Sequence, residues 1–258
     1  MRPFFFGEAE RPLFGVYEPP WAAARNTGVV LCYPGAQEYN ATHWAFRKLT
    51  SLLSSAGYHV LRFDWSCTGD SAGESADGRP ETWIQDLRLA VEELREQAGI
   101  RAVSLIGMRL GATLAYRCAM EFAVRELVLW EPVVSGVDYV RDLRALDDRR
   151  RLRLLHPPGP EDELLGFPFP AAQRQAIEAL DLRQLALPKA RRVLLFAALE
   201  SRSLHELHAK LKPMSVPSEL HLFPGEEGLQ SASEREAALL SGKVLAAMTD
   251  ALGGREKA

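Results

Sequence analysis

The sequence lacks several features that would identify a class of protein at once. Its 31 Lys and Arg residues against 34 Asp and Glu leave a formal net charge of −3 over 258 residues, without the basic surplus of nucleic-acid-binding proteins. Its longest apolar runs, 127–130 and 193–199, are far shorter than the about 18 residues that span a bilayer. Gly7 and Glu8 interrupt the N-terminal FFF before a signal-peptide core forms. We therefore expect a soluble protein with no nucleic acid partner and no membrane span.

Cysteine is also scarce. The three residues Cys32, Cys67 and Cys118 are too few for a disulfide scaffold, and no C-x-x-C pair indicates a zinc site. His205 and His208 are spaced by three residues, but no third metal ligand is evident near them. The sequence predicts a cytoplasmic protein with no metal and no cofactor.

The rest of the composition is that of an ordinary globular chain, with 47% hydrophobic and 25% charged residues. Short apolar runs alternate with helical patterns, as in a mostly parallel sheet flanked by helices. The strands are predicted at 28–33, 59–65, 101–106, 125–130, 192–199 and 217–223. Helices are predicted at 43–56, 80–94, 110–122, 171–179, 203–211 and 233–252. We expect one α/β domain over 1–258, with residues 137–189 inserted as a lid.

One motif stands between a predicted strand and a predicted helix. Gly107 and Gly111 flank Arg109 in the sequence GMRLG, at the place and spacing of a nucleophile elbow, where the turn needs room for close backbone approach. The central residue of such an elbow is a nucleophile in an enzyme. An arginine side chain cannot be deprotonated and cannot take that part.

Several motifs resemble one family over nearly the whole chain. They are PFFFG at 3–7, LFGVY at 13–17, PG at 34–35, EYN at 38–40 with His43, LRFD at 61–64, TGDSAG at 68–73, GMRLGA at 107–112 and LWEPVVSG at 129–136. The chain resembles α/β-hydrolases of the serine-aminopeptidase-like group. It is most similar to the exosortase A system-associated hydrolases of the second type and their relatives in bacterial biosynthetic clusters. The resemblance implies the α/β-hydrolase fold with an inserted lid, and an arginine at the elbow as a feature of the group.

The other members of a Ser-His-acid triad should follow in chain order. The resemblance implies an acid after strand 192–199, which is Glu200, or after the preceding strand, which is Glu131. A histidine should follow the last strand, but PGEEGL at 224–229 contains none, and His221 falls inside that strand. The standard triad is therefore predicted to be missing, as in a pseudoenzyme, because the mechanism needs a hydroxyl activated by an imidazole.

Arg109 has two compatible roles in such a chain. It can form an internal ion pair with Glu131, Glu200 or Glu38, since buried charges are usually paired. It can also present its guanidinium fork to a carboxylate or phosphate of a ligand. We predict a pocket for an acyl or anionic small molecule, or for a partner enzyme, lined by Arg109, Met108, Gly35, Glu38, Tyr39, Asn40, His43 and Glu131.

An alternative is an active esterase, thioesterase or acyl transferase with relocated catalytic residues. Cys67 or Ser66 would then act with His43 and with Glu131 or Glu200. His43 also fits a surface or capping position in the first turn of a helix, with Asn40 or Thr42 as the N-cap.

Overall fold

The computed structural model describes residues 1–157, 159–212, 217–223 and 241–253. Its main sheet has eight strands in the order β1-β2-β4-β3-β5-β6-β9-β10. They are β1 (Arg2–Glu8), β2 (Arg11–Glu18), β3 (Thr27–Cys32), β4 (His59–Phe63), β5 (Ala102–Met108), β6 (Val124–Trp130), β9 (Ala190–Ala197) and β10 (Ser218–Leu222). From β4 to β10 neighbouring strands pair in parallel, whereas β2 pairs antiparallel with both β1 and β4. The predicted mostly parallel sheet is confirmed.

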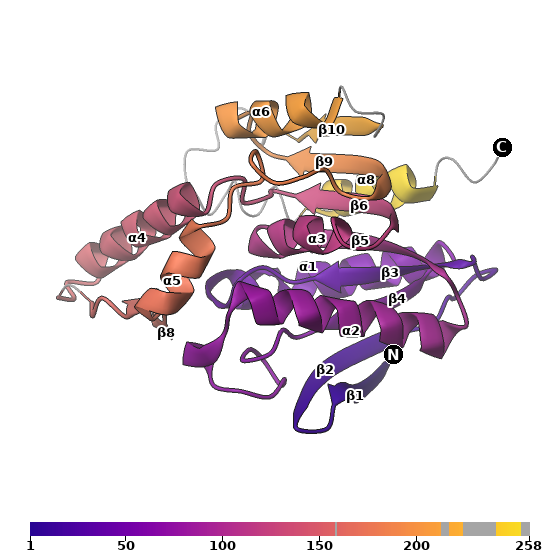
Figure 1. Ribbon diagram of the computed structural model, residues 1–258, viewed down its shortest axis with the longest axis horizontal. Helices are drawn as coiled ribbons and strands as arrows, with labels where there is room; N and C mark the ends of the chain where they lie inside the picture. The colour runs from indigo at the N-terminus through magenta and orange to yellow at the C-terminus, as the bar shows by residue number, and fades with distance from the viewer. Residues whose placement is uncertain (158, 213–216, 224–240, 254–258) are drawn as a thin grey trace.

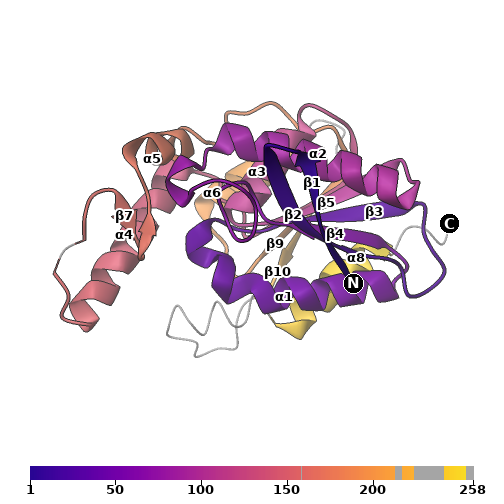
Figure 2. The ribbon, with the colours of Figure 1, turned by 90° about the horizontal axis from the view of Figure 1, so that it is seen from below.

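The centre of the sheet is apolar because helices cover both of its faces. Every residue of β3 is buried, as is typical of a parallel strand with no solvent side. The helices α1 (Ala36–Ser55) and α8 (Gly242–Gly253) cover one face, and α2 (Pro80–Ala98) and α3 (Leu110–Ala119) cover the other (Figures 1 and 2). The predicted stripe of α2 faces the core, since Trp83, Leu87, Val91 and Leu94 are all buried.

Between β6 and β9 the chain leaves the sheet. It forms α4 (Gly136–Arg153), a short hairpin of β7 (Glu163–Leu164) and β8 (Phe167–Pro168), and α5 (Ala171–Glu178). In both ribbon views this segment projects to one side of the sheet (Figures 1 and 2). Its two ends are joined at the base, where Ser135 bridges Asp181 and the amide of Gly136 donates to the carbonyl of Leu180 at 2.7 Å.

The remaining described elements are the 3-10 turn η1 (Ser75–Asp77) and α6 (Arg202–Leu211), which lies between β9 and β10. All six predicted strands are confirmed within a few residues of their predicted bounds. Residues 233–240 of the last predicted helix lie outside the described residues, and α8 begins at Gly242.

The structure differs from the sequence prediction at the start of α1 and at the N-terminal hairpin. The prediction of Asn40 or Thr42 as a helix N-cap is wrong, because α1 begins at Ala36 after Gly35 and has no side-chain cap. The Thr42 hydroxyl instead donates to backbone carbonyls within the helix. The antiparallel hairpin of β1 and β2 was not predicted, because its exposed strand β1 shows no clear alternation of buried and exposed residues.

Candidate functional site

The turn between β5 and α3 has the geometry expected of an elbow. Arg109 has φ 53° and ψ −122°, a backbone conformation that residues other than glycine rarely adopt. A Cβ atom at Gly107 would overlap the backbone of Gly111 and Ala112, and one at Gly111 would overlap the carbonyl of Tyr33. The two glycines therefore allow a tight strand-to-helix turn with Arg109 at its centre.

The side chain of Arg109 is held by two other elements. Its Nε donates to Oε1 of Glu38, in the first turn of α1, at 2.8 Å. The hydroxyl of Tyr139 on α4 donates to Oε2 of the same carboxylate at 2.8 Å. The guanidinium carbon also lies 5.4 Å from the centre of the Tyr139 ring, within cation–π range. Of the three carboxylates considered from the sequence, Glu38 is the ion-pair partner of Arg109.

This arrangement keeps the Arg109 guanidinium charged and leaves its two terminal nitrogens without an acceptor among the described residues. Burial lowers the pKa of Arg109, but the charge of Glu38 and the contact with Tyr139 raise it above its ordinary value. The side chain is 29% exposed. Within the described part of the chain, its terminal nitrogens Nη1 and Nη2 take part in no hydrogen bond. The outer edge of the guanidinium is thus available to a further acceptor.

Glu131 lies directly after β6 and also has a strained backbone, with φ 47°. Its Oε1 accepts a hydrogen bond from the amide of Ala198, at the end of β9. Burial raises the pKa of the Glu131 carboxyl, while that hydrogen bond and the charge of Arg109 lower it by less. The structure thus places two ionisable groups at the ends of neighbouring strands, Arg109 after β5 and Glu131 after β6.

A pocket of about 230 Å³ opens over the carboxyl ends of β5, β6 and β9. This is the edge at which open α/β sheets bind ligands. Arg109 and Glu131 follow β5 and β6 at this edge, and the N-terminal ends of α4 and α6 also contribute to the lining. Its lining residues are Arg109, Glu131, Pro132, Val133, Val134, Ser135, Asp138, Tyr139, Asp142, Ala197, Leu199, Ser201, Ser203 and Leu204.

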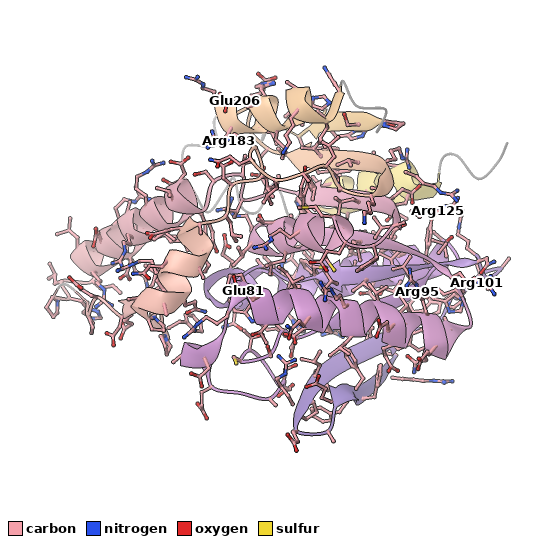
Figure 3. The ribbon with its side chains drawn as sticks, in the orientation of Figure 1. Glu81, Arg95, Arg101, Arg125, Arg183 and Glu206 are labelled. Carbon is pink, nitrogen blue, oxygen red and sulfur yellow. The ribbon has the colours of Figure 1, made fainter. Side chains whose placement is uncertain are left out.

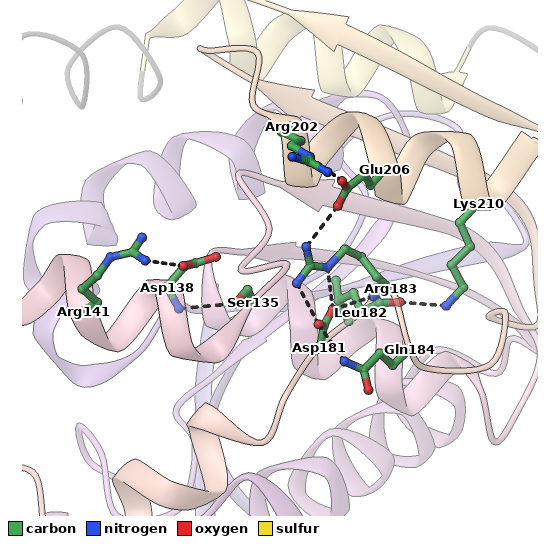
Figure 4. A network of polar contacts seen from close by, with 10 residues as sticks. All are labelled: Ser135, Asp138, Arg141, Asp181, Leu182, Arg183, Gln184, Arg202, Glu206 and Lys210. Atoms are coloured by element: carbon green, nitrogen blue, oxygen red, sulfur yellow. Dashed lines mark hydrogen bonds and ion pairs between the residues drawn. The ribbon is translucent and has the colours of Figure 1, made fainter.

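The sides of the pocket are fixed by capping and by ion pairs. Ser135 caps α4 by accepting a hydrogen bond from the amide of Asp138, whose carboxylate pairs with Arg141 (Figure 4). In the same network Arg183 makes a two-point contact with Asp181 and reaches Glu206 on α6 at 3.0 Å. The base of the α4–α5 segment is thus tied to α6.

The charged residues at the other end of the sheet are remote from this pocket. Arg183 and Glu206, which is on α6, lie on the pocket side of the molecule. Arg95, Arg101 and Arg125 lie together at the opposite end of the sheet (Figure 3). The Nε of Arg95 donates there to the carbonyl of Arg101 at 3.2 Å.

Of the other sequence-predicted residues, Tyr39, Asn40, His43 and Glu200 do not line the pocket. The hydroxyl of Tyr39 donates to Asp64 at 2.7 Å, and Asn40 is exposed. His43 stacks on Tyr33 with ring centres 6.0 Å apart, and burial lowers its pKa. Glu200 is exposed, and its Oε2 lies 3.3 Å from Nε2 of His205.

Ser66 and Cys67 lie elsewhere too. The Ser66 hydroxyl is fully buried and donates to Asp86 at 2.7 Å. Cys67 is buried and, together with Gly35, lines a separate cavity of only about 20 Å³. Met108, the last residue of β5, is buried and does not reach the main pocket. Among the described residues, no serine or cysteine side chain hydrogen-bonds to a histidine side chain.

Over the described residues, no three His, Cys, Asp or Glu side chains gather as metal ligands would. No helix in that part of the chain has the length and apolar character needed to cross a membrane.

Tyr139 and Asp138, the α4 residues that line the pocket, were not predicted from the sequence. A signal for them was present in the sequence. Ser135 and Asp138 form an S-x-x-D pattern, which marks the N-terminus of a helix. That pattern places the next residue, Tyr139, in the first turn of the helix.

Comparison with solved structures gives alpha/beta hydrolases over nearly the whole chain. Alpha/beta hydrolase domain-containing protein 10 from mouse has 15% identity and a TM-score of 0.62, covering 98% of this chain and 100% of that one. Est1E from Butyrivibrio proteoclasticus, solved with ferulic acid bound, has 13% identity and a TM-score of 0.68, covering 97% and 96%. Proline iminopeptidase from Mycobacterium smegmatis has 12% identity and a TM-score of 0.65, covering 98% of both chains. At these identities the likeness shows the fold.

No curated protein sequence matches the chain. The family model described as the alpha/beta hydrolase family matches residues 13–251. The sheet order, the elbow turn between β5 and α3, and the pocket over the strand ends all agree with that match. The chain belongs to the alpha/beta hydrolase family.

Proposed function

We propose that this protein works without a Ser-His-acid triad and binds a small acyl- or carboxylate-bearing molecule in the pocket beside Arg109. The observation that carries the proposal is the unused edge of the Arg109 guanidinium, at the centre of the elbow turn and on the wall of the pocket. A guanidinium with two free terminal nitrogens matches the two oxygens of a carboxylate.

The argument against triad chemistry begins at the elbow. Arg109 cannot attack a carbonyl, since its side chain carries neither a hydroxyl nor a thiol. The second argument is the missing base, because the sequence contains no histidine after His221. His221 lies within β10 and stacks on Phe196 with ring centres 4.7 Å apart. A Ser-His-acid mechanism requires a histidine base, which we expected after the last strand of the sheet.

The pocket supplies what a binding site needs. Glu38 and Tyr139 hold the guanidinium in one orientation, so that little side-chain freedom is lost when a ligand binds. Val134, Leu199 and Leu204 offer apolar surface for an acyl group.

The α4–α5 segment (residues 136–178), which corresponds to the predicted insertion at 137–189, is the lid of this site in our proposal. Its α4 contributes Asp138, Tyr139 and Asp142 to the wall. The likeness of the sequence motifs to exosortase A system-associated hydrolases favours a place in a bacterial biosynthetic pathway. In that setting the ligand would be a pathway intermediate, and the protein would deliver or retain it rather than hydrolyse it.

Two measurements test the proposal together. Purified protein should hydrolyse p-nitrophenyl acetate and butyrate no faster than a heat-killed sample. Butyrate should bind the native protein in calorimetry and bind Arg109→Ala at least about 10-fold more weakly. Arg149→Ala, on the exposed surface of α4, is the matched control and should bind as the native protein does. Ester hydrolysis well above the heat-killed sample and lost in Arg109→Ala would overturn the proposal.

A further inference from the structure

The charges that line the pocket do not balance. The pocket lining contains one guanidinium, that of Arg109, and three carboxylates, those of Glu131, Asp138 and Asp142. Asp138 and Asp142 are both paired with Arg141. The remaining carboxylate, Glu131, has no Lys, Arg or His nitrogen within ion-pairing distance among the residues that the structure describes.

Glu131 hydrogen-bonds to the described residues through only one of its two carboxylate oxygens. Its Oε1 accepts from the amide of Ala198, but Oε2 accepts no hydrogen bond from the described residues. The residue is partly buried and lines the pocket. Carboxylates in such places are normally paired or hydrogen-bonded, because taking a charge out of water is costly. A ligand with a cationic nitrogen would supply the missing partner.

A ligand with a carboxylate alone uses only the Arg109 side of this pocket and meets like charges there. At the free edge of Arg109 it would lie near the carboxylate of Glu38, which already neutralises the guanidinium, and in the same pocket as Glu131. Like charges that share a partly buried site repel one another more strongly than they do in water. A positive charge on the ligand, placed at Glu131, would offset this repulsion.

We infer that the pocket takes a compact amino-carboxylate, with its carboxylate on Nη1 and Nη2 of Arg109 and its ammonium group on Oε2 of Glu131. This inference rests on the proposed function and narrows its class of ligand. The volume of about 230 Å³ favours a small molecule, since sites for drug-sized ligands occupy about 300–1,000 Å³. Glu131 is then a specificity-determining residue that selects amines among carboxylates.

Calorimetry with matched probes tests the inference. The probes are glycine, 3-aminopropanoate, 4-aminobutyrate and 5-aminovalerate, each compared with the carboxylic acid and the amine of the same chain length. We expect one amino acid of the series to bind at least about 10-fold more tightly than its matched acid and its matched amine. Glu131→Gln should reduce its affinity to that of the acid. Asp148→Asn, an exposed charge change on α4 away from the pocket lining, should leave the affinity unchanged.

The outcomes separate this inference from the proposed function. If an acid binds the native protein as tightly as its amino analogue, and Glu131→Gln does not weaken the amino analogue, the inference is overturned and the proposed function stands. If neither the acids nor the amino acids bind, both are overturned. A thermal melt of Glu131→Gln identifies loss of binding through unfolding, and Glu131→Asp provides a second variant that keeps the charge.

Discussion

Arg109 and Glu38 are 71 residues apart in the chain, yet the Nε of one donates to the carboxylate of the other at 2.8 Å. Glu38 lies in the segment that follows β3 and Arg109 in the turn that follows β5, and these two strands are neighbours in the sheet. The hydroxyl of Tyr139, on α4, donates to the same carboxylate. One side chain, Glu38, therefore joins two strand-end segments to the segment that projects from the sheet.

Glu38→Gln should destabilise the protein by about 1–3 kcal/mol, because a partly buried guanidinium loses its charged acceptor. Tyr139→Phe should cost about 1 kcal/mol, because it removes one hydrogen bond. Urea unfolding of both single variants and the double variant measures these values. The double variant should cost less than the sum, since both changes remove contacts of one carboxylate. Glu81→Gln, on an exposed side chain in the first turn of α2, is the control and should stay within about 0.5 kcal/mol of native.

Arg109→Ser should not produce an efficient esterase. The new hydroxyl would stand at the elbow without a histidine to activate it, and triad members act as a unit. Hydrolysis of p-nitrophenyl acetate by this variant should remain within about 10-fold of the native protein. A rise of about 1,000-fold would show that a general base lies within reach of residue 109 and would contradict the missing triad.

Gly111→Ala should destabilise the protein by about 3 kcal/mol or more, because the added methyl group would overlap the backbone carbonyls of Cys32 and Tyr33. Neither carbonyl can move away without disturbing the end of β3. Gly242→Ala is the matched control, since a Cβ atom there meets nothing within 4 Å. Thermal unfolding of the two variants should separate them clearly, and equal melting temperatures would contradict the tight turn.

The stability of the protein should depend on pH through Glu131. Burial raises the pKa of this carboxyl in the folded protein above its value of about 4.3 in an unfolded chain. Just above that value the folded state holds more protons than the unfolded state, so the contribution of Glu131 to stability falls as pH rises.

Glu131→Gln cannot titrate at this position. Its free energy of unfolding relative to the native protein should therefore rise with pH from about 4 upward, and then level off once the native Glu131 is ionised. Urea unfolding at a series of pH values measures the difference. Glu200→Gln, on an exposed side chain, is the control. A difference that does not change with pH would contradict the raised pKa.

Ser66 should serve a structural role. Its hydroxyl and its amide both donate to the buried Asp86, so Ser66→Ala should cost about 1–3 kcal/mol of stability. A fluorophosphonate probe should leave the intact mass of the native protein unchanged, and an acyl probe reactive toward thiols should not label Cys67. An adduct on either residue would support the alternative of relocated catalytic residues.

The strands could be read from the sequence, whereas the partners of Arg109 could not. The apolar run at 28–33 is visible because both faces of β3 are covered, and the spacing of Gly107 and Gly111 reports a purely local turn. The choice of Glu38 over Glu131 and Glu200 depends on where α1 begins, and that depends on Gly35 rather than on a capping side chain. Residues distant in sequence meet through the sheet order, which no local pattern encodes.

The position of β3 between β4 and β5 has a consequence for synthesis of the chain. Thr27 pairs with Ala102, so the central strand gains its second neighbour only after β5 has left the ribosome. Until then one edge of an apolar strand remains unpaired, and contacts between residues so distant in sequence form slowly. A nascent chain stalled between β4 and β5 should therefore require a chaperone, and release of β5 should end that dependence.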